Sequence, residues 1–101
     1  MNDTFYFNGL VLSSKTHKCA LYGKELVLTD TEFSILEMLM KHKGQPVSMN
    51  ALAKWIWPNE TIVECENTIC VHVHNIRKKL NDNHKPFQFI KTVRGTGYVI
   101  R

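Results

Sequence analysis

Hydrophobic positions change their spacing twice along the chain. Residues 1–28 hold short β-prone runs separated by turn-forming residues, which is typical of antiparallel strands. From residue 29 to residue 80, apolar residues recur at three- and four-residue intervals, which is typical of helices. Residues 87–101 return to strand-like runs on either side of an Arg-Gly-Thr-Gly turn. The pattern predicts one α+β domain with a four-stranded antiparallel sheet, three helices and a C-terminal β-hairpin.

Capping residues mark the ends of the first two helices. Thr29 and Glu32 have the spacing of a capping box, and Gly44 is placed to end the helix that follows. The apolar face of this helix comprises Phe33, Leu36, Leu39 and Met40. Ser48 caps the second helix and Pro58 closes it. Its apolar face comprises Leu52, Trp55 and Ile56, so we expect Trp55 to pack in the core and Trp57 to be partly exposed. The polar stretch PNETIVE is expected to be a loop.

The third helix is predicted over residues 66–80 and has two different faces. At about 100° per residue, one narrow arc is apolar and forms the core face, made of Ile69, Val73, Ile76 and Leu80. The opposite side gathers Asn67, Cys70, Val71, His74 and Lys78, flanked by Asn75 and Arg77. After this helix, Gly95 and Gly97 are expected to supply positive φ angles for a tight hairpin turn that leaves Arg94 in solvent.

Charge is distributed unevenly within the 101 residues. Residues 1–66 hold six lysines against eight acids, whereas residues 67–101 hold seven basic residues against Asp82 alone. A polyanion would therefore bind to the last third of the chain. No apolar run is long enough to span a bilayer, and the three cysteines, Cys19, Cys65 and Cys70, are expected to be free thiols in the cytoplasm.

A helix-turn-helix with a polar, cationic second helix and a basic hairpin fits duplex DNA as a winged helix does. The helix fits the major groove, where Asn67 and Asn75 suit adenine, Val71 a thymine methyl group and His74 an acceptor. We expect phosphates to be neutralised by Arg77, Lys78 and Lys91, and the adjacent minor groove to be entered by Arg94.

Three segments carry a resemblance to a known family. The stretch LTDTEFSILEMLMKHKGQPVSMNALAKWIWPN, followed by VHVHNIRKKL and FIKTVRGTGYVI, resembles the OmpR/PhoB-type winged-helix DNA-binding domain of bacterial transcription regulators over nearly the whole chain. The resemblance implies the same fold: an N-terminal sheet (1–28), a three-helix core (29–80) and a wing (87–101). It also implies double-stranded DNA as the partner, promoter repeats as the site and self-association on them.

The resemblance implies roles for individual residues. The major groove would be faced by Asn67, Thr68, Val71, His74 and Asn75, and the wing would be marked by Thr92, Arg94, Thr96 and Tyr98. RNA polymerase would be contacted by the loop of Asn59, Glu60, Thr61, Ile62, Val63 and Glu64. The chain departs from the family where Asn67 replaces a common arginine, Cys70 an acidic residue and His74-Asn75 basic residues, which leaves the operator sequence open.

Other functions find less support in the sequence. Cys65, Cys70, His72 and His74 are possible ligands by type, but residues two apart on a helix diverge by about 200°, so no metal is expected. No motif joins a serine, a histidine and an acid, so we expect neither catalysis nor a cofactor or small-molecule substrate. The alternative is a winged helix that binds a protein and has lost DNA contact.

Two kinds of parent protein are compatible with the domain. It could be the effector part of a two-component response regulator within a phosphorelay, or the cytoplasmic part of a ToxR-like regulator that is anchored in the membrane by a segment outside this chain. A domain that begins at Met1 favours the second parent.

Overall fold

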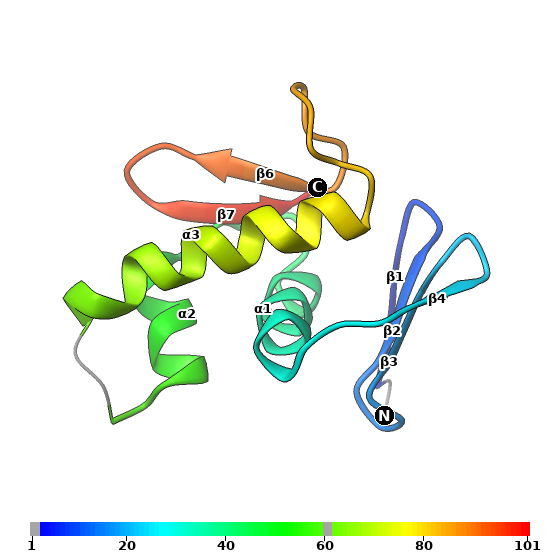
Figure 1. Ribbon diagram of the computed structural model, residues 1–101, viewed down its shortest axis with the longest axis horizontal. Helices are drawn as coiled ribbons and strands as arrows, with labels where there is room; N and C mark the ends of the chain where they lie inside the picture. The colour runs from blue at the N-terminus through cyan, green and yellow to red at the C-terminus, as the bar shows by residue number, and fades with distance from the viewer. Residues whose placement is uncertain (1–2, 60–61) are drawn as a thin grey trace.

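The N-terminal third forms the predicted four-stranded antiparallel sheet. The computed structural model describes residues 3–59 and 62–101, and for 62–67 it describes the backbone only. The strands β1 (Thr4–Phe7), β2 (Leu10–Ser13), β3 (Lys18–Leu21) and β4 (Lys24–Leu26) lie side by side in chain order. Side chains alternate between the two faces of this sheet, and Leu10, Leu12 and Cys19 lie on the buried face, which packs against the core that includes α1. Figure 1 shows this sheet at one end of the molecule, beside α1 and away from the C-terminal hairpin.

Helix α1 (Asp30–Lys41) begins at the predicted capping box. Glu32 N–H donates to Thr29 Oγ1 at 3.2 Å, and Thr29 N–H donates to Glu32 Oε1 at 3.0 Å. The helix ends before Gly44, whose φ of +90° lets the chain reverse toward α2. The N–H of Gly44 then donates to the carbonyl of Ile100 at 2.8 Å, which joins this turn to the last strand.

The Glu32 carboxylate also joins the start of α1 to the end of α3. Its Oε1 accepts a hydrogen bond from Lys79 Nζ at 2.6 Å, and the glutamate is 3% exposed. Burial would raise the pKa of Glu32, but the hydrogen bonds from Lys79 and from the backbone of Thr29, together with the charge of Lys79, hold it below its ordinary value. The ionised carboxylate is therefore part of the folded structure.

Replacing Glu32 by glutamine is expected to lower the free energy of unfolding at pH 7 by about 2 kcal/mol, because the acceptor of Lys79 Nζ loses its negative charge and the ion pair is lost. Since the folded-state pKa is lowered, the carboxylate stabilises the fold above the ordinary pKa of 4.5 and loses this effect as the pH falls through the folded value. In urea unfolding, the difference in free energy of unfolding between the wild type and Glu32→Gln should be smaller at pH 3 than at pH 7. Glu25→Gln, on exposed β4, is the control, and an equal Glu32→Gln effect at both pH values would contradict the assignment.

Helix α2 (Met49–Ile56) starts where the sequence predicted, but Trp55 does not lie as expected. Ser48 Oγ accepts from Ala51 N–H at 3.0 Å, which confirms Ser48 as the cap. The expected burial of Trp55 is wrong: it is 45% exposed with Lys41 Nζ 5.2 Å from its ring. Trp57 is half-buried against the core, which confirms its predicted partial exposure. The buried positions of α2 are Leu52 and Ala53, and Trp55 lies about 200° around the helix from Ala53.

Helix α3 (Ile62–Lys79) is longer than the predicted 66–80. The turn-forming residues Pro58 and Asn59 come before it, and nothing in the sequence after residue 61 interrupts a helix. The predicted core face is confirmed, because each of Ile69, Val73, Ile76 and Leu80 is at most 2% exposed. The part of PNETIVE from Ile62 onward is therefore helix, and the prediction of a loop there is wrong.

The wing belongs to a three-stranded sheet with the order β5-β7-β6. Its hairpin comprises β6 (Ile90–Val93) and β7 (Gly97–Ile100), and the third strand is the two-residue β5 (Val47–Ser48), which the sequence analysis missed. Phe87 and Gln88, expected in a strand, lie outside it. The N–H groups of Gln88, Phe89 and Ile90 donate instead to the buried carboxylate of Asp82, at 2.5, 3.0 and 3.1 Å.

Candidate nucleic-acid interface

The outward face of α3 is polar and carries no carboxylate from residue 68 onward. Val71 is 58% exposed, His74 and Lys78 are exposed, and Asn75 is half-buried beside them. The exposed face also includes Thr68 and Cys70. In residues 68–101 the single acid is Asp82, which is 2% exposed, so this part of the face presents no negative side chain to solvent. The side chain of Asn67, predicted to read bases, lies outside the described residues.

The tip of the wing presents Arg94 to solvent. Arg94, Gly95 and Thr96 are exposed, and Gly95 has a φ of +74°, as predicted for the turn. The same prediction is wrong for Gly97, which is not among the residues with positive φ. A Cβ atom on Gly97 would lie 2.1 Å from the carbonyl oxygen of Val47, so the glycine is needed for the close approach of β5 and β7.

Tyr98 was predicted to contact DNA, but it lies beneath the surface. It is 7% exposed, and its hydroxyl donates to Cys70 Sγ of α3 at 3.4 Å. Burial raises the pKa of the Tyr98 phenol, and the hydrogen bond to Cys70 adds to this effect. The ring is therefore a contact between the wing and α3.

Arg77 was predicted to neutralise a phosphate, and the structure gives its guanidinium several partners within the protein. Its Nε and one terminal nitrogen donate to the carbonyl of Ile90 at 3.1 and 2.7 Å, and the terminal nitrogen also donates to Thr92 Oγ1 at 2.9 Å. Burial lowers the pKa of Arg77, and the negative charge of the Asp82 carboxylate opposes this effect. The helical repeat indicates only that Arg77 lies near the core face, four residues after the buried Val73, and it does not reveal these partners.

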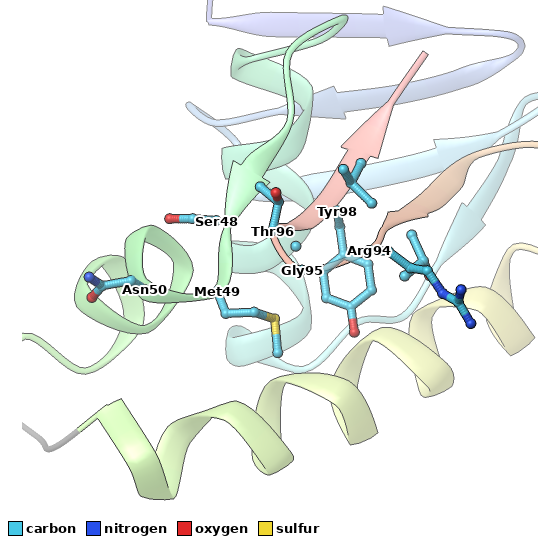
Figure 2. A pocket seen from close by; sticks show the side chains of 10 residues that line it. Ser48, Met49, Asn50, Arg94, Gly95, Thr96 and Tyr98 are labelled. Carbon is cyan, nitrogen blue, oxygen red and sulfur yellow. The ribbon is translucent and has the colours of Figure 1, made fainter.

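A groove of about 580 Å³ separates the wing from the start of α2. Figure 2 shows Ser48, Met49 and Asn50 on one side of it and Arg94, Gly95 and Thr96 on the other. The N–H of Met49 donates to the carbonyl of Thr96 at 3.0 Å, so the start of α2 is bonded to the wing turn. The wing and the helix-turn-helix therefore form a continuous surface.

A second groove, of about 700 Å³, lies on the other side of the wing. It is lined by Lys85, Pro86, Phe87, Lys91, Thr92 and Arg94. The ammonium group of Lys91, predicted to neutralise a phosphate, donates to the carbonyl of Arg101. Lys85 and Arg94 are exposed, which extends the positive surface from the wing tip to the loop after α3.

The segment predicted to contact RNA polymerase is only partly described. Asn59 is exposed, and Glu60 and Thr61 lie outside the described residues. The backbone of Ile62, Val63 and Glu64 belongs to α3, so these three residues form its first turn, which corrects the expected loop.

Cys70, His72 and His74 of α3 do not converge, and the side chain of Cys65 lies outside the described residues. Cys70 and His74 are exposed, whereas His72 is half-buried with its ring 6.5 Å from that of Trp57. Within the part of the chain that the structure describes, no three His, Cys, Asp or Glu side chains are placed to hold a metal ion. Cys19 and Cys70 are free thiols, and burial raises the pKa of Cys19 to about 11. None of the helices in the described residues is both long and apolar enough to cross a membrane.

Three helices, a long third helix with a polar outer face and a hairpin beside it define a winged helix-turn-helix domain. Residues 23–100 match the family model described as "Transcriptional regulatory protein, C terminal". The chain belongs to this family, the OmpR/PhoB-type DNA-binding domains, as the sequence motifs predicted.

Known proteins resemble the chain in sequence and in structure. It is 46% identical over 93 residues to the regulatory protein VanR of Enterococcus faecium, covering 92% of the chain and 40% of the relative. The DNA-binding domain of RstA from Klebsiella pneumoniae, solved in complex with the RstA box, superposes with a TM-score of 0.87 at 30% identity and covers 98% of the chain and 97% of that domain. The DNA-binding domain of CpxR from E. coli superposes with a TM-score of 0.84 at 32% identity, and the match covers 98% of the chain and 96% of that domain. The chain spans about two fifths of the length of the curated relatives it matches.

Proposed function

We propose that this chain is the DNA-binding output domain of a bacterial transcription regulator. In this proposal α3 lies in the major groove of duplex DNA and the wing reaches the adjacent minor groove. The observation that carries the proposal is the outer face of α3 from Thr68 onward, which carries no acid and lies in the same domain as the exposed Arg94. The RstA domain, whose fold superposes over nearly the full chain, was solved with its DNA site, which supports the same mode here.

The exposed residues suggest a division of roles. Base edges would be met by Thr68, Val71, His74 and Asn75, with Val71 against a thymine methyl group. Lys78 would neutralise a phosphate, and Arg94 would enter the minor groove. Thr92, Thr96 and Lys91 would lie against the sugar-phosphate backbone at the wing. A base contact by Asn67 stays a prediction from sequence.

We propose a response regulator of a two-component system as the parent protein, acting in the cytoplasm. The support is the similarity to VanR and the other regulatory proteins, of whose length the chain spans about two fifths. A contact of residues 59–64 with RNA polymerase and self-association on repeated DNA sites belong to the same proposal, because one small domain covers only one half-site. We propose no catalytic activity, cofactor or metal.

The experiment that tests DNA binding is selection from a randomised duplex pool with the purified domain, followed by affinity measurements at several salt concentrations. We expect a repeated half-site to be enriched, and its affinity to fall steeply with salt because phosphate contacts release counterions. If nothing is enriched and retention is weak even at low salt, the DNA proposal fails. A role in binding another protein would then be the alternative.

Arg94→Ala is expected to raise the Kd for the selected site by about tenfold, because a minor-groove arginine and its charge are lost. Fluorescence anisotropy with a labelled duplex measures the change. Arg101→Ala is the matched control, since Arg101 is an exposed arginine beyond the last strand. Equal effects of the two substitutions would show that Arg94 contributes only net charge.

A further inference from the structure

The guanidinium of Arg77 bridges the recognition helix and the first strand of the wing. It donates two hydrogen bonds to the Ile90 carbonyl and one to Thr92 Oγ1, all between 2.7 and 3.1 Å. Its central carbon lies 3.7 Å from the centre of the Phe87 ring, so the ring supports the plane of the guanidinium. Three groups, the Ile90 carbonyl, the Thr92 hydroxyl and the Phe87 ring, thus set the orientation of one side chain on α3.

The same segment is tied to the end of α3 through Asp82. The N–H of Asp82 donates to the Arg77 carbonyl at 2.6 Å, and the Asp82 carboxylate accepts from Ile90 N–H at 3.1 Å. Ile90 is therefore held through both of its backbone groups, the carbonyl by Arg77 and the N–H by Asp82. This places the start of β6 at a fixed position relative to α3.

A second contact lies nearer the wing tip, where the Tyr98 hydroxyl donates to Cys70 Sγ at 3.4 Å. Cys70 and Arg77 are seven residues apart, which corresponds to about two helical turns. The wing is therefore joined to α3 at two points along the helix axis. With only one contact the hairpin could rotate about that point, and the second contact prevents this rotation.

We propose that Arg77 is a positioning residue, which holds the wing at the separation from α3 needed to occupy two grooves of DNA at once, and that it does not itself neutralise a phosphate. This inference rests on the proposed DNA-binding function. If the wing were free to move, binding would require it to be ordered, and the lost conformational entropy would weaken affinity. An arginine suits this role because its planar fork can donate to two acceptors in fixed directions, whereas a lysine ammonium is a point charge.

The two roles predict different responses to salt. Removing a phosphate contact lowers the slope of log Kd against log salt concentration by about 0.9. Removing a positioning contact raises the Kd and leaves the slope unchanged, because the number of neutralised phosphates stays the same. Arg77→Lys separates the roles further, since lysine keeps the positive charge and lacks the fork.

The experiment measures Kd for the selected duplex at five salt concentrations for the wild-type domain and for the variants Arg77→Lys, Arg77→Gln, Phe87→Leu and Lys78→Ala. We expect Arg77→Lys to raise Kd about tenfold and Phe87→Leu by a few-fold, both at the wild-type slope. The neighbouring exposed Lys78 is the control for a phosphate contact, and Lys78→Ala should lower the slope by about 0.9. Phe87 carries no charge, so its substitution tests the positioning role independently of any phosphate contact.

Amide hydrogen exchange on the DNA-free domain supplies a second readout. We expect Arg77→Lys to accelerate exchange in β6, whereas Lys78→Ala should not. Wild-type affinity of Arg77→Lys with unchanged exchange would overturn the proposal, as would a slope lowered by about 0.9 in Arg77→Gln. If the wild-type domain bound no duplex, the proposed function would fail, and faster exchange in Arg77→Lys would still show that Arg77 holds the wing.

Discussion

Replacing Gly97 by alanine is expected to lower the free energy of unfolding by about 3 kcal/mol, as overpacking against rigid backbone does. The added Cβ would lie 2.1 Å from the Val47 carbonyl oxygen and 3.0 Å from the Met49 nitrogen. Both atoms belong to backbone that is fixed by the pairing of β5 with β7 and by the start of α2. The clash can be relieved only if β5 moves away from β7. Urea unfolding monitored by circular dichroism measures the loss.

Gly95→Ala is the matched control for this prediction. Gly95 lies two residues earlier in the same turn, has a φ of +74° and has open space around its would-be Cβ. An alanine there costs only backbone strain, about 1 kcal/mol. If the two variants were equally stable, the close approach of β5 would not be the reason for the glycine at position 97.

Asp82→Ala is expected to destabilise the domain by about 3 kcal/mol, because three backbone N–H groups lose their acceptor at once. The loss should be concentrated between α3 and β6, where no other strand is paired with residues 87–89 in the described structure. Hydrogen exchange should therefore accelerate at Gln88, Phe89 and Ile90 beyond the global change. Urea unfolding gives the overall effect.

Asn83→Ala serves as the control for Asp82→Ala, since Asn83 is the adjacent residue and is exposed. It should change the free energy of unfolding by no more than about 0.5 kcal/mol. A small effect of Asp82→Ala with unchanged exchange at residues 88–90 would show that the carboxylate does not hold the loop.

The elements that the sequence predicted well are those with local signals. The caps at Thr29 and Ser48 fix the starts of α1 and α2, because a side chain and the backbone three residues later form the bond. The core face of α3 follows from the helical repeat alone. By contrast, β5 has two residues and exists only because β7 lies beside it, so no local pattern could reveal it.

For the candidate interface, too, the sequence predicted only the features that have a local signal. The repeat of α3 identified its outward face, and the charge distribution identified the basic third of the chain. The placements of Arg77 and Tyr98 depend on partners 13 to 28 residues away, which the helical repeat does not contain. The strand expected from residue 87 does not begin until Ile90 for a related reason, because the Asp82 carboxylate takes the N–H groups of Gln88 and Phe89 that a neighbouring strand would have used.

The pairing of β5 with β7 has a consequence for engineering the domain. Residues 47–48 precede α2 in the chain but lie in the sheet of the wing, with the C-terminal strand between them and β6. A chimera that exchanged α3 alone for that of a relative would separate it from the wing residues that hold it. A transplant that is meant to carry operator preference from one regulator to another should therefore take residues 47–101 as one block.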